Sequence, residues 1–165
     1  MKTKIKSDIF NFCESKVRSN ENGSTVIIPH VCNNIGLFGA GFAGAVRSRY
    51  PIVAQNFEML GNHTKLGYVQ YISDYKKELY NHEMIFANMI AQNGIVSSKN
   101  RRPLNYEALV KCMTNVRNFI QNSDKENVEI HCPKFGSGLA GGDWKFIEQL
   151  IEDIWPNYTI CVHTK

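Results

Sequence analysis

Short apolar runs alternate with segments of helical spacing along the chain, and this alternation predicts its secondary structure. Residues 24–29 form an apolar run of strand length. Two further apolar runs, at 66–72 and 83–89, are separated by a polar turn at 73–81, and strands that follow one another in this way commonly pair antiparallel. Further strands are predicted at residues 1–6, 128–132 and 158–163. The segment between the first two strands is predicted to be a loop.

Helical spacing predicts four helices in the remaining segments. The longest begins at Pro103, because apolar residues then recur every three or four positions along one face. Those residues are Leu109, Cys112, Met113, Val116, Phe119 and Ile120. A second amphipathic helix is predicted from Asp143, and two shorter ones at 42–50 and 52–60, on either side of Pro51. Strands and helices in this order predict an α/β fold, with three α/β/α layers around a central mixed sheet of about six strands.

Composition and charge narrow the function classes. The chain has 165 residues, of which 43% are hydrophobic and 21% charged, and this ordinary globular mix predicts one domain over residues 1–165. The net charge of +4 suits an anionic ligand. Lys and Arg are scattered instead of forming a stripe with aromatic residues, which argues against a nucleic-acid partner. No segment approaches the roughly 20 apolar residues of a membrane span, and the N-terminus lacks a signal-peptide core, so we expect no membrane partner and a cytoplasmic location.

The cysteines give no sign of a metal or disulfide framework. The chain has an odd number of cysteines, and no two of them have C-x-x-C spacing. They are Cys13, Cys32, Cys112, Cys132 and Cys161. From sequence we therefore expect no metal site and no cofactor.

Two glycine-rich loops of the same form are the main candidates for ligand binding. The first glycine loop, GAGFAG, spans residues 39–44, and the second glycine loop, GSGLAG, spans residues 136–141. Each lies between a predicted strand and a predicted helix, where backbone N–H groups and a helix N-terminus can bind phosphate. The two loops together predict a phosphate-bearing small molecule held from both sides, beyond the carboxyl ends of the strands.

A dinucleotide-binding fold does not explain these loops. Its fingerprint needs the first glycine directly after the strand and an acidic residue about 20 positions later, at the end of the next strand. Here the residues HVCNNIGLF separate the strand at 24–29 from Gly39, and the later position falls near Glu58, within helical spacing. A Walker A sequence is absent too, because G-K-[ST] follows neither loop.

Four segments, in this order, resemble those of the macrodomain family. SDIF at 7–10 resembles an adenine-binding turn, and HVCNNIGLFGAGFA at 30–43 resembles the ribose-binding loop. ANMIAQNG at 87–94 resembles a central strand with its N-x-x-A-Q ending, and PKFGSGLAGGDW at 133–144 resembles the phosphate loop. The resemblance covers nearly the whole chain and is greatest to the group typified by ADP-ribose 1″-phosphate phosphatases of yeast, bacteria and phages. It implies a macrodomain-like fold that binds ADP-ribose.

The resemblance also assigns binding roles. Asp8 is expected to accept a hydrogen bond from the adenine amino group, with the Ile9 amide at the ring edge, although an Asp here can instead cap a helix. Asn33, followed by Asn34, is expected to bind the distal ribose, although Asn33 can instead order its own loop. The loop backbones are expected to hold the distal ribose and the diphosphate: Gly39, Ala40, Gly41, Phe42, Gly136, Ser137, Gly138, Leu139, Ala140 and Gly141. His163 is either at the adenine edge or a surface residue.

Three activities remain open in this family: a non-catalytic reader of ADP-ribose, an ADP-ribosyl hydrolase acting on ester-linked ADP-ribose, for example on modified proteins, and a phosphatase. One glycohydrolase subgroup uses a Lys at the end of the central strand and an Asp in the phosphate loop, but Gln92 and Ala140 stand here. We therefore expect metal-independent hydrolysis of ADP-ribose 1″-phosphate, with His30 as the proton-transfer group. Asp143 is expected either to assist His30 or to cap the helix that follows it.

Overall fold

A six-stranded mixed sheet forms the centre of the protein in a computed structural model that describes residues 2–19, 24–73 and 83–164. The strands are β1 (Lys2–Lys6), β2 (Thr25–Asn33), β3 (Val69–Ser73), β4 (Glu83–Gln92), β5 (Val128–Cys132) and β6 (Thr159–Thr164). They lie in the order β1-β6-β5-β2-β4-β3. Among these strands, β3 and β4 pair antiparallel and the other neighbours pair parallel. The carboxyl ends of β2, β4 and β5 therefore meet at one edge of the sheet.

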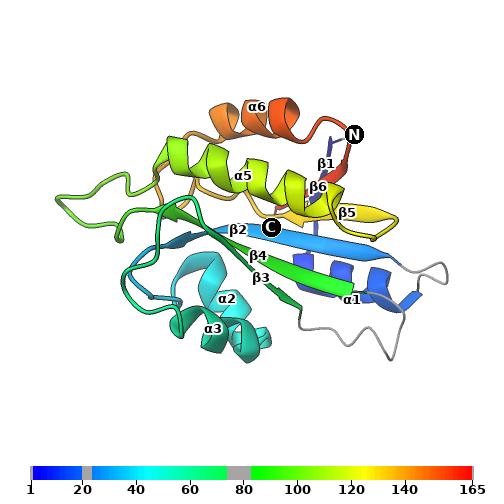
Figure 1. The fold of residues 1–165 in the computed structure, drawn as a ribbon, viewed down its shortest axis with the longest axis horizontal. Helices are drawn as coiled ribbons and strands as arrows, with labels where there is room; N and C mark the ends of the chain where they lie inside the picture. The colour runs from blue at the N-terminus through cyan, green and yellow to red at the C-terminus, as the bar shows by residue number, and fades with distance from the viewer. Residues whose placement is uncertain (1, 20–23, 74–82, 165) are drawn as a thin grey trace.

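Helices cover both faces of the sheet, as Figure 1 shows. One face carries α1 (Ile9–Ser19), α2 (Gly41–Arg49) and α3 (Pro51–Glu58), and the other carries α5 (Tyr106–Gln121) and α6 (Trp144–Ile154). Each layer encloses its own apolar core, and β2 contributes to both because it is buried on both faces. Val26 and Ile28 pack toward α1 and α3, while Ile27 packs toward α5 and α6. The predicted three-layer α/β fold is confirmed.

Two sequence predictions about local structure were wrong. The segment between β1 and β2 was expected to be a loop but forms α1, whose Ile9, Phe10, Cys13 and Val17 are buried at helical spacing. The strand expected at 24–29 continues to Asn33, because β4 pairs with β2 along that whole length. Residues 34–38 then separate β2 from the first glycine loop.

Most predicted elements match the structure to within a few residues. The longest helix begins at Tyr106 instead of Pro103, since Asn105 caps it by accepting a hydrogen bond from the Ala108 amide. The antiparallel pairing of the two central apolar runs is confirmed, although residues 74–82 of the expected connection lie outside the described residues. Within the part of the chain that the structure describes, no helix is long and apolar enough to cross a membrane.

Candidate ligand-binding site

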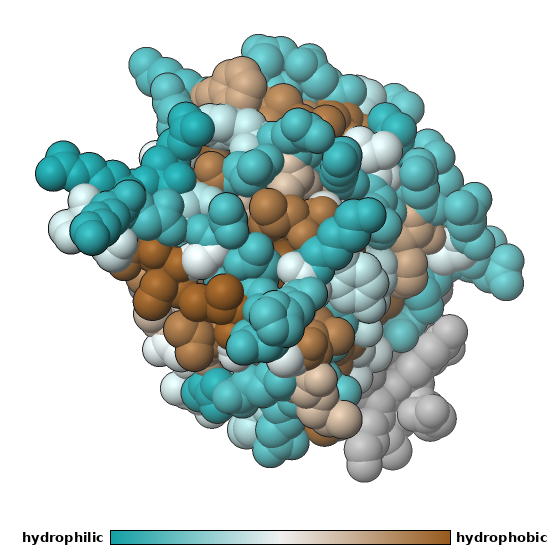
Figure 2. Space-filling view, turned by 60° about the vertical axis from the view of Figure 1, so that its left-hand side comes forward, coloured by the Kyte–Doolittle hydropathy of each residue, from teal (hydrophilic) through white to brown (hydrophobic). Residues whose placement is uncertain are grey.

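A cavity of about 820 Å³ lies at the carboxyl ends of the strands, between the two glycine loops. This volume is in the range of sites that enclose a small molecule. The predicted site residues that line it are His30, Asn33, Gly39, Ala40, Gly41, Phe42, Gly136, Gly138, Leu139 and Ala140. Exposed apolar side chains of Leu37, Ile95 and Val96 also belong to its wall. Figure 2 turns this end of the molecule forward and shows apolar surface gathered among polar residues.

The first glycine loop leads directly into the N-terminus of α2 at the cavity wall. Ala40 occupies the N-cap position with φ −125° and ψ 155°, and no side chain within the described residues caps the helix there. Gly41 follows with φ +58°, a conformation that favours glycine. A Cβ on Gly44 would lie 2.9 Å from the Gly39 carbonyl oxygen, so the loop requires glycine there as well. The first-turn amides of α2 are thus left without a side-chain acceptor beside the cavity.

The second glycine loop leads to a helix end that already has a cap. Gly136 and Gly141 have φ values of +77° and +79°, and a Cβ on Gly142 would lie 2.5 Å from the Gly136 carbonyl oxygen. The Asp143 side chain accepts a hydrogen bond from the Lys145 amide at 2.9 Å and caps α6. Asp143 does not line the cavity, and neither does Ser137 or Gly141. Of the two roles expected for Asp143 from sequence, its contacts match the helix cap.

His30 lies at the cavity wall as a buried, neutral ring. Its Nε2 is 2.6 Å from Asn88 Oδ1, and Asn88 donates its amide hydrogen to Gln70 Oε1 at 3.0 Å. Because the Asn88 oxygen must therefore accept, Nε2 of His30 carries the proton and Nδ1 has the lone pair. Burial lowers the pKa of His30 to about 4, and the hydrogen bond to Asn88 offsets only part of this effect. Phe38 and Phe42 pack edge-on against the ring.

The two asparagines after β2 order the loops around the cavity. Asn33 accepts hydrogen bonds from the Ile35 and Leu37 amides and donates to the Leu37 carbonyl oxygen at 2.6 Å. This is the loop-ordering alternative, although Asn33 also reaches the cavity wall. Asn34 bonds Asn93 and the Gly94 amide, and it does not line the cavity.

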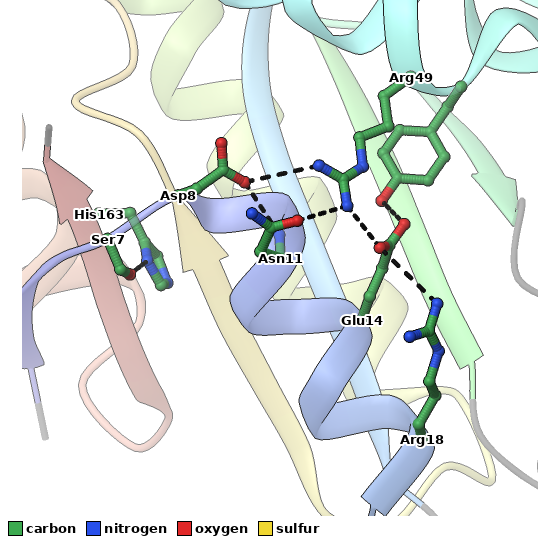
Figure 3. Close-up of polar contacts among 8 residues, drawn as sticks. Ser7, Asp8, Asn11, Glu14, Arg18, Arg49 and His163 are labelled. Atoms are coloured by element: carbon green, nitrogen blue, oxygen red, sulfur yellow. Dashed lines mark hydrogen bonds and ion pairs between the residues drawn. The ribbon is translucent and has the colours of Figure 1, made fainter.

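Asp8 and Ile9 lie at the start of α1, outside the wall of the cavity. Asp8 Oδ1 accepts a hydrogen bond from the Asn11 amide at 2.9 Å, which is a helix cap, and lies 3.9 Å from Nη1 of Arg49. Arg49 also donates to Asn11 and Glu14 at 2.6 Å each, so α2 is tied to the first turns of α1 (Figure 3). Ile9 is buried in the core, and an adenine role for either residue stays a prediction.

Three charged residues of the cavity wall escaped the sequence predictions. Arg47 donates through Nε to the Phe38 carbonyl oxygen at 2.6 Å and pairs with Glu58 at 2.9 Å. Lys134 lies two residues before the second glycine loop, and all three residues line the cavity. Lys134 belongs to the segment that resembles the phosphate loop, and its place two residues after the end of β5 was the available signal. Arg47 and Glu58 come from two helices, so no local spacing relates them to the site.

Comparison with known proteins places the fold. No known protein-family model matches the sequence. An uncharacterised 17.5 kDa protein from the tk-vs intergenic region of Enterobacteria phage T4 is 28% identical over 128 residues, which are 76% of this chain and 77% of that protein. A macrodomain protein from Streptomyces coelicolor has a similar structure, with 26% identity, a TM-score of 0.71, and coverage of 100% of this chain and 99% of that one. The chain has a macrodomain fold.

The macrodomain fold also relates the chain to a structure that contains ADP-ribose. DarTG of Thermosipho africanus, solved in complex with ADP-ribose, superposes with a TM-score of 0.66 at 13% identity, over 83% of this chain and 37% of that one. At this identity the likeness concerns the fold alone. The family resemblance drawn from the four sequence segments is therefore confirmed at the level of the macrodomain fold.

Proposed function

We propose that this macrodomain binds ADP-ribose or a derivative of it in the cavity between the two glycine loops. The observation that carries the proposal is the uncapped N-terminus of α2, whose residues Ala40, Gly41 and Phe42 line the cavity. A helix N-terminus with free amides attracts an anion, and a phosphate group of the ligand would supply the missing acceptor. The capped N-terminus of α6 offers no equivalent position.

Charge and volume support the same proposal. Arg47 and Lys134 bring positive charge to a wall that is otherwise largely apolar, while Glu58 is paired with Arg47. Apolar walls with a few placed polar groups suit a nucleotide, whose base and sugars need contact area and whose phosphates need donors. The ADP-ribose held by the DarTG neighbour has this chemistry.

Hydrolysis of ADP-ribose 1″-phosphate is a second candidate function, and the position of His30 favours it. His30 lines the cavity beside the first glycine loop, and its unprotonated Nδ1, which lies 3.7 Å from the Cys32 thiol, is the atom that would accept a proton from an attacking water. The loop amides would stabilise the charge on the transferring phosphoryl group. Asp143 has no step in this proposal, because it caps α6 away from the cavity wall.

Calorimetric titration and a phosphate-release assay separate binding from catalysis. We expect ADP-ribose to bind with a Kd at least tenfold lower than that of adenosine, which lacks the diphosphate. Equal affinity for both would contradict the proposed phosphate site. Phosphate release from ADP-ribose 1″-phosphate above the protein-free rate would support the phosphatase. If ADP-ribose binds and no phosphate is released, the protein is a reader of ADP-ribose.

A further inference from the structure

A second cluster of chemically active side chains lies under α1, outside the cavity wall. Cys13 of α1, His131 of β5 and His163 of β6 place one ligand atom each within 4.8 Å of one another. Their side chains are buried, with exposed fractions of 0%, 0% and 6%. His163 is thus not the surface residue that its place near the chain end had suggested. Three such groups from three elements meet because α1 packs against β5, where its Phe12 ring contacts both imidazoles.

Each imidazole has an outer nitrogen, which bonds a residue outside the cluster, and an inner nitrogen, which faces the other ring. His131 Nε2 lies 3.0 Å from Glu129 Oε1, and His163 Nδ1 lies 3.1 Å from the Ser7 hydroxyl, as Figure 3 shows for the latter. The inner nitrogens, His131 Nδ1 and His163 Nε2, are 2.9 Å apart. Because Glu129 accepts from Nε2 of His131, Nδ1 of His131 accepts the hydrogen bond that His163 Nε2 donates. Imidazoles that bind metal likewise bond their outer nitrogen to a carboxylate or hydroxyl, and their inner nitrogen then faces the ion.

We propose that Cys13, His131 and His163 bind a Zn²⁺ ion, with water in the fourth position. One thiolate and two neutral imidazoles are a ligand set that zinc prefers. When the ion binds, a Zn–S bond replaces the S–H bond of Cys13, and that proton leaves to solvent. The hydrogen of His163 moves from Nε2 to Nδ1, where it is donated to the Ser7 hydroxyl, and both inner lone pairs then face the ion.

The charges around the cluster suit this state. The Glu129 carboxylate pairs with Lys16 at 2.9 Å and lies 3.0 Å from Nε2 of His131, so it keeps the proton of that ring on the outer nitrogen. The Ser7 hydroxyl, 3.1 Å from Nδ1 of His163, can accept the hydrogen of the second ring in the same way. Burial raises the pKa of the Cys13 thiol, so zinc must displace its proton.

An overlapping group, Glu129, His131 and Cys161, is the less suitable site. It holds a single imidazole, and the Glu129 carboxylate is already bonded to Lys16 at 2.9 Å. The absence of C-x-x-C spacing, which argued against a zinc site from sequence, does not bear on ligands contributed by three separate elements.

Metal loading during refolding tests this site directly, because its ligands are closed off in the folded protein. The full chain is unfolded with reductant and chelator and refolded with Co²⁺ or Zn²⁺, and the metal retained after gel filtration is measured. We expect about one ion per chain, a thiolate-to-Co²⁺ charge-transfer band, and a Tm raised by several degrees in Zn²⁺. Wild-type protein that retains no metal would overturn the proposal.

Two variants assign the ligands. Cys13→Ser should lose the charge-transfer band and at least tenfold in Co²⁺ affinity. Cys112→Ser is the matched control, because Cys112 is also a buried thiol but lies on α5 and donates to the Tyr68 and Ile90 carbonyl oxygens. An unchanged band in Cys13→Ser would exclude Cys13. If Cys13→Ser does not fold, a charge-transfer band retained by His163→Gln at full intensity would overturn the site instead. ADP-ribose binding to metal-free protein is a separate measurement, so the outcome for either site leaves the other proposal intact.

Discussion

A carboxylate placed at the N-cap of α2 should stabilise the fold and weaken ligand binding. Ala40 is exposed and already has the extended backbone of an N-cap, so Ala40→Asp can accept hydrogen bonds from the first-turn amides without strain. The new cap should raise the free energy of unfolding by about 1 kcal/mol, and Tm by roughly 3 °C. A ligand phosphate about 5 Å from the new charge would be repelled by about 3 kcal/mol at an effective dielectric constant of about 20. The Kd for ADP-ribose should therefore rise roughly 100-fold.

Thermal unfolding and calorimetric titration measure the two effects on the same samples. Ala40→Asn is the matched control, because it caps the helix without adding charge. It should gain similar stability and lose at most about tenfold in affinity, since it lacks the repulsive term. An Ala40→Asp protein that is more stable and binds ADP-ribose as tightly as the wild type would refute a phosphate at this helix end.

Three further predictions concern single residues. If His30 transfers a proton, His30→Gln should lower the rate of phosphate release from ADP-ribose 1″-phosphate by about 100-fold or more. The Kd for ADP-ribose should change by less than about threefold. An unchanged rate of phosphate release would remove His30 from the mechanism. Asp8→Ala should weaken binding of ADP-ribose but not of ribose 5-phosphate, and equal weakening of both places Asp8 away from the adenine. Because the pKa of folded His30 is about 4, below the ordinary 6.5, the unfolded chain takes up the proton first, so stability should fall as pH drops from 6.5 to 4. Denaturant unfolding at pH 7 and pH 5 should show a smaller loss in His30→Gln, and an equal loss would mean that His30 does not cause it.

The sequence predicted the fold well where apolar spacing and pairing act locally. In β2 and on the buried face of α5, apolar residues recur at the spacing of a strand and of a helix, so the sequence predicted the type of each element. Helix α1 was missed because Asp8 and the apolar residues after it were interpreted through a binding motif and not through helical spacing. The end of β2 was missed because His30 and Asn33 are polar residues in a strand, and the partner that buries His30, Asn88, lies on β4.

The candidate site was only partly predictable, for the same physical reason. Each glycine loop is a continuous run of sequence, so its place at the cavity could be inferred from the motif and from the order of the strands alone. The protonation of His30 depends on a chain of contacts through Asn88 to Gln70, and the cluster of Cys13 with His131 and His163 depends on three elements meeting. Neither is encoded in local spacing, and both require the packed fold.

The location of the ligand diphosphate tests the central claim most directly. A crystal structure of the protein soaked with ADP-ribose should place a phosphate oxygen within hydrogen-bond distance, about 3 Å, of the Gly41 or Phe42 amide at the start of α2. Density for the ligand outside the cavity, or a diphosphate that contacts neither amide, would contradict the account.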